Sequence, residues 1–189
     1  MPDSSLLPAT NMDATDQTMI SAEDQAGLSA AVFEWAESYD TKDWDRLRKA
    51  IAPILRVDYR AIIGRLWEAM PAEEFIILIS SRALLGDPLL VTQHLVAATR
   101  WELISPTDAV GYHQIYAPHL KYEDESKTKV LLRGYAHGTN KHWYKKIDGV
   151  WKFAGLEPEV RWLEYDFDKI FVFARDLFGG GGQRMAAKE

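Results

Sequence analysis

Six polar side chains stand singly in otherwise apolar segments of this chain, and their types suit proton-transfer chemistry. They are Tyr39, Asp40, Tyr59, His94, His119 and Asn140. Two imidazoles and a carboxylate can remove and return a proton, and tyrosine hydroxyls can donate hydrogen bonds to a carbonyl oxygen. No metal-ligand spacing, glycine-rich phosphate loop or serine nucleophile elbow competes with them. The set therefore indicates acid–base chemistry on an uncharged or weakly acidic organic substrate inside a hydrophobic pocket.

The same residues also have structural interpretations. A single histidine on a strand, such as His94 or His119, is more often a hydrogen-bonded structural group than a catalyst. Tyr59 could be a core residue whose hydroxyl is satisfied at the rim, and Asp40 could cap a helix or pair with Lys42. Residue spacing alone therefore leaves both interpretations open, and the structural one is the more common.

The other histidines give no sign of a metal site. His113 and His119 lie six residues apart on one predicted strand, too far for a single metal ion, and no carboxylate is near them on that strand. We therefore expect no metal. His137 and His142 are expected to be surface or sheet-face residues.

Composition limits the class of protein. A length of 189 residues suits one domain with a good core. Hydrophobic residues make up 47%, and 7 Trp, 8 Tyr and 7 Phe suggest a pocket or interface lined by rings. A net charge of −6 makes nucleic acid an unexpected partner, because phosphate binding needs a basic face. With 0 Cys, disulfides and thiolate chemistry are excluded.

Targeting and membrane signals are not recognisable in the chain. No apolar run approaches the roughly 20 residues needed to span a bilayer, so we expect no membrane partner. The polar N-terminus lacks the pattern of a secretory signal, and we expect a cytoplasmic protein. We expect a mobile N-terminal tail over residues 1–27, a single folded domain over residues 28–178, and a flexible C-terminal tail over residues 179–189.

Hydrophobic periodicity predicts helices first, then long strands, then a final helix. The predicted helices cover residues 28–40, 44–50, 72–79 and 166–178. Asp43 should cap the second of these and Pro53 should end it, while Pro71 should begin the third. The predicted strands cover residues 54–60, 91–104, 109–122, 129–147 and 150–165, with a hairpin at Asp148-Gly149. This order predicts an α+β fold, in which a curved antiparallel sheet wraps around helices and leaves a conical cavity.

Alternation along the strands predicts which side chains face the cavity. Asn140 shares a face with Gly138 and His142, so an inward Asn140 would place Gly138 beside it and open space there. On the preceding strand His119 shares a face with Ala117, unless Pro118 introduces a bulge.

Several long stretches resemble the scytalone dehydratase family, fungal melanin-pathway enzymes of the NTF2-like (SnoaL-like) superfamily. The matching stretches are Glu34–Lys49, Leu66–Phe75, Thr92–His94, Gly111–Gln114, His142–Leu156 and Asp166–Asp168. The match runs without obvious gaps from about Val32 to Phe178. The resemblance implies a cone-shaped α+β barrel, usually a homotrimer, that dehydrates a hydroxylated cyclic polyketide ketone and needs no cofactor or metal. In fungi it also leaves an endosomal or vesicular location open.

The resemblance also implies catalytic roles. Tyr39 and Tyr59 match the pair that polarises the substrate carbonyl through a held water. His94 matches the general base that removes the proton beside that carbonyl and then helps the hydroxyl depart. Asp40 and His119 match the partners that orient and charge-balance this imidazole.

Substrate-binding positions follow from the same resemblance. Asn140 matches the amide that binds a substrate hydroxyl, and the C-terminal helix would act as a lid. The pocket-wall positions are Trp35, Ile62, Leu78, Leu84, Leu156, Pro158, Val160, Phe167 and Phe171.

The chain departs from the family pattern at the pocket. Gly138 stands where the family has Ser, Ile62 where it has Phe, and Ala117 where it has Val. These changes suggest a substrate that is bulkier than scytalone or differently decorated. Two alternatives stay open: an isomerase, cyclase or pericyclic catalyst on the same scaffold, and a ligand-binding or inactive member.

Overall fold

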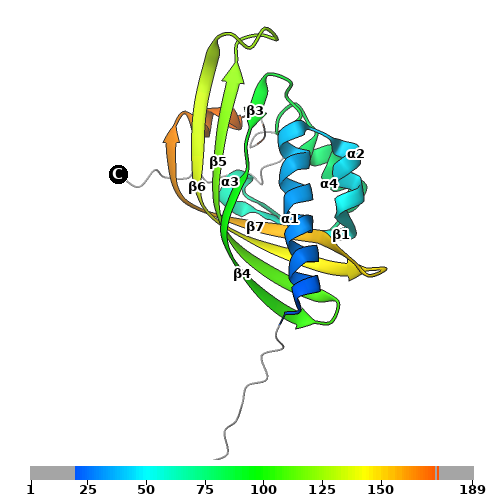
Figure 1. The fold of residues 1–189 in the computed structure, drawn as a ribbon. Coiled ribbons are helices and arrows are strands. Elements are labelled where there is room, and N and C mark those ends of the chain that lie inside the picture. Colours follow the sequence, from blue (N-terminus) through cyan, green and yellow to red (C-terminus); the bar gives the residue numbers. More distant parts are fainter. Residues whose placement is uncertain (1–19, 173, 175–189) are drawn as a thin grey trace, which may run out of the picture.

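A strongly bent sheet wraps around the first helix in the computed structural model, which describes residues 20–172 and residue 174. Figure 1 shows this helix, α1 (Ala22–Thr41), lying across the bent strands, with α2 (Trp44–Ala50) and α4 (Ala72–Ile79) beside it. Residues 1–19 and 179–189, which hold most of the two expected tails, lie outside the described residues. Within the described part, no helix is long and apolar enough to cross a membrane.

Two of the five helices within the described residues have the predicted bounds, two differ at the chain's ends, and one was not predicted. They are α1 (Ala22–Thr41), α2 (Trp44–Ala50), α3 (Arg60–Ile63), α4 (Ala72–Ile79) and α5 (Phe167–Ile170). The predicted bounds of α2 and α4 are confirmed, and Asp43 caps α2 by accepting the N–H of Arg46 at 2.9 Å. Helix α3 was not predicted. Most of the expected final helix beyond α5 lies outside the described residues.

Helix α1 begins at Ala22, earlier than the Leu28 predicted as the start of the folded domain. The hydroxyl of Ser21 accepts the N–H of Asp24 at 3.0 Å and so caps the helix. The Asp24 carboxylate in turn accepts hydrogen bonds at 2.8 Å from Lys146 and from the Trp151 indole. Polar residues that look like a tail in the sequence therefore form helix because they are anchored to a distant hairpin, formed by β6 (Val130–Ile147) and β7 (Val150–Tyr165).

Within the described residues, seven strands form one sheet. They are β1 (Ile51–Tyr59), β2 (Arg65–Pro71), β3 (Leu90–Thr92), β4 (Leu95–Ser105), β5 (Asp108–Tyr122), β6 (Val130–Ile147) and β7 (Val150–Tyr165). The order is β2-β1-β7-β6-β5-β3, and β4 also pairs with β5. The sheet is antiparallel as expected except at β1 and β7, which pair in parallel.

Three details of the strands differ from the prediction, the first being β2, which was not predicted. Pro53, expected to end α2, lies inside β1, where the pairing with β7 is interrupted between Ile51 and Arg56. A proline has no N–H to donate, so an interrupted ladder tolerates it. The predicted strand 91–104 is split into β3 and β4, because His94 gives its backbone N–H to Asp40 instead of to a strand.

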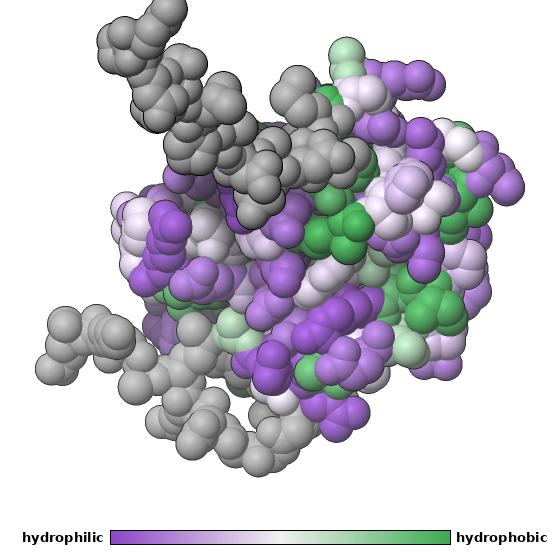
Figure 2. Space-filling view, turned by 90° about the horizontal axis from the view of Figure 1, so that it is seen from below, coloured by the Kyte–Doolittle hydropathy of each residue, from purple (hydrophilic) through white to green (hydrophobic). Residues whose placement is uncertain are grey.

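Aromatic rings fill the core between α1 and the concave face of the sheet. Trp35 on α1 is 1% exposed and stacks on Phe153 of β7, with ring centroids 5.6 Å apart and planes 17° apart. Phe75 of α4 also packs against Phe153, with ring centroids 6.3 Å apart. On the outer surface, Figure 2 shows hydrophobic residues in separate patches among hydrophilic ones.

Candidate active site

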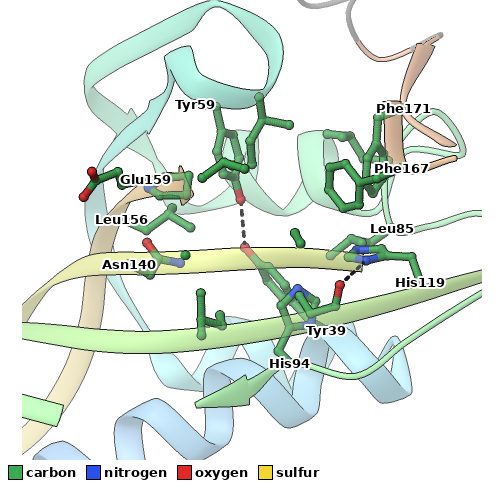
Figure 3. Close-up of a pocket in the computed structure, with 18 of the residues that line it drawn as sticks. Tyr39, Tyr59, Leu85, His94, His119, Asn140, Leu156, Glu159, Phe167 and Phe171 are labelled. Carbon is green, nitrogen blue, oxygen red and sulfur yellow. Dashed lines mark hydrogen bonds between the residues drawn. The ribbon is translucent and has the colours of Figure 1, made fainter. Parts of the chain in front are cut away.

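A cavity of about 110 Å³ lies beside the aromatic core and is lined mostly by apolar side chains. Its walls come from α1, the end of β1, α3, the segment before β3, the concave faces of β5, β6 and β7, and α5. Figure 3 shows Tyr39, Tyr59, His94, His119 and Asn140 gathered around this space. These residues lie far apart in the sequence, so the fold is what brings them together.

Most predicted site residues line the cavity. Those that do are Trp35, Tyr39, Tyr59, Ile62, Leu84, His94, His119, Gly138, Asn140, Leu156, Pro158, Val160, Phe167 and Phe171. Asp40 instead lies behind His94 and contacts its ring. Leu78 is buried in the core cluster, whereas its neighbour Ile79 lines the cavity.

Asp40, in the last turn of α1, fixes the position of His94. Its Oδ2 accepts the backbone N–H of His94 at 2.7 Å, and its Oδ1 lies 2.6 Å from Nδ1 of the His94 ring. The Thr92 hydroxyl donates to Oδ1 at 2.8 Å. The Asp40 and His94 side chains are only 11% and 10% exposed. The carboxylate is therefore fully engaged in holding the short segment between β3 and β4.

These hydrogen bonds also bear on where the protons of Asp40 and His94 lie. Burial acts to raise the pKa of Asp40, but hydrogen bonds from His94 and Thr92, together with the His94 ring, outweigh burial and lower the pKa below its usual value. An ionised carboxylate can only accept, so Nδ1 of His94 must carry the proton. In the neutral form of this ring Nε2 is the nitrogen without a hydrogen, which is the form that a general base requires.

His119, on β5, lies beside His94 and is held in a neutral state. The two ring centroids are 5.9 Å apart, with the rings edge to face. Burial, followed by the neighbouring His94, lowers the pKa of His119 to about 3. Its Nδ1 lies 2.8 Å from the carbonyl oxygen of Ala117, so Nδ1 carries the hydrogen and donates it.

Tyr39 and Tyr59 present two hydroxyls at one point of the cavity. Their oxygen atoms are 3.4 Å apart (Figure 3), and the side chains come from the last turn of α1 and the last residue of β1. Burial raises the pKa of Tyr59 to about 12 and that of Tyr39 well above its usual value. Both hydroxyls therefore keep their protons and can donate hydrogen bonds to a ligand oxygen.

Asn140 offers an amide to the cavity from the concave face of β6. It is 4% exposed, and among the described residues its Oδ1 has no hydrogen-bond partner. A buried amide oxygen without a partner costs free energy, which a ligand donor could recover. The Oδ1 of Asn140 is therefore available to accept a hydrogen bond from a ligand in the cavity.

The expectation that Gly138 opens space beside Asn140 is wrong. A Cβ atom placed on Gly138 would lie 1.9 Å from the carbonyl oxygen of Glu159. The β6–β7 pairing shifts register between His137 and Gly138, and this bulge pushes the Glu159 backbone into the space that a side chain would use. The missing side chain therefore allows a close approach of two strands and does not enlarge the cavity.

Several cavity residues were not predicted. They are Ile63, Ile79, Leu85, Ile115, Ala136, His137, Thr139 and Glu159. Strand alternation could have found two of them, because Ile115 shares a face with Ala117 and Ala136 shares one with Gly138. Ile79 and Leu85 lie around a turn, where no periodic signal exists.

A second polar group lies in the core beneath Trp35. The Tyr144 hydroxyl is 3.0 Å from Nε2 of His113 and 2.9 Å from Nδ1 of His142. The Thr99 hydroxyl is 2.9 Å from Nδ1 of His113 and extends this hydrogen-bond network. Both histidines are 0% exposed, so of the two positions expected for His142, a sheet face or the surface, the sheet face is right and the surface is wrong. Burial lowers the pKa of His113 to about 4 and that of His142 well below its usual range.

The side chains around the cavity suit acid–base chemistry. Among the described residues, no group of three or more His, Cys, Asp or Glu side chains could hold a metal ion. The cavity combines one imidazole held by a carboxylate, two protonated tyrosine hydroxyls and an amide oxygen without a partner among the described residues, all within apolar walls. It can remove a proton from carbon while donors stabilise the charge that develops on a neighbouring oxygen.

Comparisons with known proteins show which family and which fold the chain is similar to. A family model described as scytalone dehydratase matches residues 19–178. The chain is 57% identical to the scytalone dehydratase of Colletotrichum orbiculare over 89% of this chain and 90% of that protein. It is 58% identical to that of Pyricularia oryzae over 85% and 93%. Among solved structures, the Kfla4162 protein from Kribbella flavida has a similar fold, with a TM-score of 0.67 at 14% identity over 78% of this chain and 96% of that one.

Proposed function

The chain belongs to the scytalone dehydratase family, and from this premise we propose that it is a carbon–oxygen hydro-lyase acting on a hydroxylated cyclic polyketide ketone. Scytalone and vermelone are the substrates proposed first, and the product is aromatic. The observation that carries the proposal is the His94–Asp40 pair, which faces the same cavity as two protonated tyrosines. The enzyme is thus a dehydratase of fungal melanin or polyketide biosynthesis.

The first step is removal of a proton beside the ketone. A proton in that position is only weakly acidic, so the enolate charge must be stabilised while the base works. In this proposal Nε2 of His94 takes the proton. The hydroxyls of Tyr39 and Tyr59 converge closely enough to donate to one oxygen atom, either the carbonyl itself or a water that contacts it.

The second step is departure of the hydroxyl from the adjacent carbon. The proton now on His94 passes to the leaving oxygen, which departs as water while the enolate electrons form the new carbon–carbon double bond. The ring becomes aromatic after tautomerisation, and this drives the reaction forward. Asp40 stabilises the imidazolium that exists between the two steps, because its carboxylate accepts the Nδ1 hydrogen.

The proposed role of His119 differs from the one that the resemblance implied. A histidine whose pKa is lowered to about 3 is neutral at physiological pH and cannot supply a balancing charge. We propose that His119 instead orients the ligand or His94 by hydrogen bonding and packing. Its ring is edge-on to Phe167 and Phe171 at 5.1 and 5.3 Å, which connects it to the apolar end of the cavity.

The substrate could still be larger than scytalone. Ile62 and Ala117 are smaller than the family residues, and both border the cavity. Gly138 no longer supports this idea, because the Glu159 carbonyl fills the space beside it. A comparison of kcat/KM for scytalone and for a three-ring hydroxyketone decides it. Equal or better turnover of scytalone would contradict the larger substrate.

Turnover of scytalone by the purified protein tests the function. We expect substrate loss and formation of the dehydrated naphthalene, and loss of nearly all turnover in the His94→Gln variant. Binding of the product, measured by quenching of tryptophan fluorescence, should survive in that variant and serves as its folding control. Unchanged turnover in His94→Gln would contradict the proposed base.

The same assay separates the competing functions. An isomerase, cyclase or pericyclic catalyst needs a shaped pocket and one polarising donor, but it does not need the complete His94–Asp40 pair. A binding protein would retain affinity and show no turnover with any hydroxyketone. The fully engaged carboxylate of Asp40 favours the dehydratase, since a binding pocket gains nothing from a histidine held as a base.

We also propose a homotrimer, as the family resemblance implies. Large apolar side chains that would gain from an interface are exposed on the surface, among them Leu95 (48%) and Ile104 (58%) on β4. Light scattering coupled to size-exclusion chromatography gives the molar mass directly. A mass equal to one chain would contradict the trimer.

A further inference from the structure

The C-terminal end of α1 sends three side chains to three different places. Tyr39 lines the cavity, Asp40 holds His94, and Lys42 extends toward the segment between α4 and β3. Lys42 itself ends the helix in a left-handed conformation, with φ 57° and ψ 32°, and its N–H bonds the carbonyl of Ser38. A non-glycine residue in this conformation is strained, so it usually has a compensating contact.

The compensating contact is a hydrogen bond from the Lys42 ammonium to the backbone carbonyl of Leu85. Leu85 belongs to residues 80–88, which we call the wall loop. Leu84 and Leu85 are 7% and 6% exposed, and both line the cavity. Figure 3 places Leu85 on the same side of the cavity as His119 and Phe167.

Among the described residues, the wall loop forms few hydrogen bonds and ion pairs with other elements. Its backbone bonds are mostly local, from Leu84 and Gly86 to the carbonyl of Ser81 at 2.9 and 3.0 Å. On the β5 side, Asp87 forms an ion pair with Lys121 at 2.9 Å. Lys42 supplies the connection to α1. The wall loop is therefore held between the strand that carries His119 and the helix that carries Asp40.

The Lys42 ammonium is half-buried and surrounded by charged groups of both signs. Burial lowers the pKa of Lys42, while Asp87 and Asp40 act to raise it and Lys127 acts to lower it further. A partly buried ammonium that loses its acceptor is costly, so the bond to Leu85 should persist while the protein is folded. The same charge adds to the lowering of the pKa of His119.

We infer that Lys42 is a positioning residue, which holds the Leu84–Leu85 wall against the end of α1 and so sets how tightly an aromatic ligand is bound. Lys42 does not touch the reacting atoms, so its removal should affect affinity much more than the chemical step. The inference rests on the proposed function only in the choice of an aromatic ligand.

The test compares Lys42→Met with a matched control, Lys146→Met. Lys146 also donates from a partly buried ammonium, but its partner is Asp24 at the other end of α1. The first readout is amide hydrogen exchange of residues 80–88. The second is the Kd of naphthalene-1,8-diol, measured by tryptophan quenching. The third is kcat and KM with scytalone. Lys42→Gln, whose shorter side chain carries no charge, replaces Lys42→Met if that variant does not fold.

In Lys42→Met, exchange in the wall loop should become faster, and Kd and KM should rise roughly tenfold, the effect of losing about 1.4 kcal/mol from one charge-assisted hydrogen bond. The value of kcat should stay within threefold. Lys146→Met should change none of these, and Lys42→Arg should bind more tightly than Lys42→Met. Unchanged exchange in residues 80–88, or a loss confined to kcat, overturns the inference. If the wild-type protein does not dehydrate scytalone, the proposed function fails, while the exchange result still decides the role of Lys42.

Discussion

Replacing Asp40 by Asn tests the proposed mechanism most directly, because it changes only the atoms that hold His94. In the native protein, Oδ2 accepts the His94 backbone N–H and Oδ1 faces the ring Nδ1. The amide oxygen of Asn must keep the bond to the His94 backbone N–H, because the amide NH2 group in that place would set one donor against another. The amide NH2 group then faces Nδ1, and Nδ1 must give up its hydrogen to accept one. The hydrogen of the neutral ring moves to Nε2.

The consequence is a correctly folded site with the wrong tautomer. With Nε2 protonated, His94 cannot act as a base, and general-base catalysis typically contributes about 10²–10⁴ to a rate. We therefore expect kcat to fall roughly 10³-fold, about 4 kcal/mol of barrier, with KM within a few fold of the native value. Steady-state kinetics with scytalone measure the loss, and nitrogen NMR of the His94 ring reports the tautomer.

A matched control makes this result specific. Asp24→Asn also removes a carboxylate that accepts hydrogen bonds on α1, from Lys146 and Trp151, but at the far end of the helix. It should lower the melting temperature and leave kcat unchanged. If Asp40→Asn kept more than a tenth of native kcat, or if Asp24→Asn lost as much, the reasoning about the tautomer would be refuted.

Three further predictions concern stability. Burial lowers the pKa of His113 to about 4 and that of His119 to about 3, so as pH falls the unfolded chain binds protons before the folded protein does. Each histidine should therefore lower the free energy of unfolding by up to about 1.4 kcal/mol per pH unit as pH falls from about 6.5 toward those values. Urea titrations at pH 7, 6 and 5 measure this, and a constant free energy would contradict it. Gly138→Ser should lower the melting temperature by several degrees, because the Glu159 carbonyl must move; calorimetry that shows no decrease would mean that the bulge relaxes freely. Asn140→Leu should raise the melting temperature by about 2–4 °C by removing an unpaired buried oxygen, while weakening product binding; an unchanged Kd would separate this amide from the ligand.

Local signals in the sequence predicted the elements that depend on local chemistry. Asp43 caps α2 through a bond three residues away, and α4 begins after Pro71 as expected. The turn at Asp148-Gly149 joins β6 to β7, with φ of 49° and 78° that this pair of residues tolerates. In each case the contact that decides the structure lies within a few residues, so the pattern contains it.

Features that depend on distant contacts were missed or misplaced. The start of α1 depends on Asp24 reaching Lys146, and the break before β4 depends on Asp40 capturing the N–H of His94. Alternation placed His142 on the same face as Asn140, but its complete burial depends on packing beneath Trp35, a contact between distant segments. The residues of the site were identified through family resemblance, whereas alternation alone could assign faces but could not show that Tyr39 and Tyr59 meet.

The parallel pairing of β1 with β7 has a consequence for how the protein folds. It joins Ile51 to Phe153 and Arg56 to Gly155, segments about 100 residues apart along the chain. Gly155 has φ 140°, and a Cβ there would lie 2.0 Å from the Arg56 carbonyl, so the pairing forms only when both segments fit closely. The β5–β7 meander is sequence-local and can form early, whereas this long-range closure is slow. Tyr39 and Tyr59 belong to the N-terminal segment that β1 brings to this pairing, whereas His119 and Asn140 belong to the β5–β7 meander. A refolding chain should therefore gain ligand binding only in its slowest phase, and no partly folded form should carry a working site.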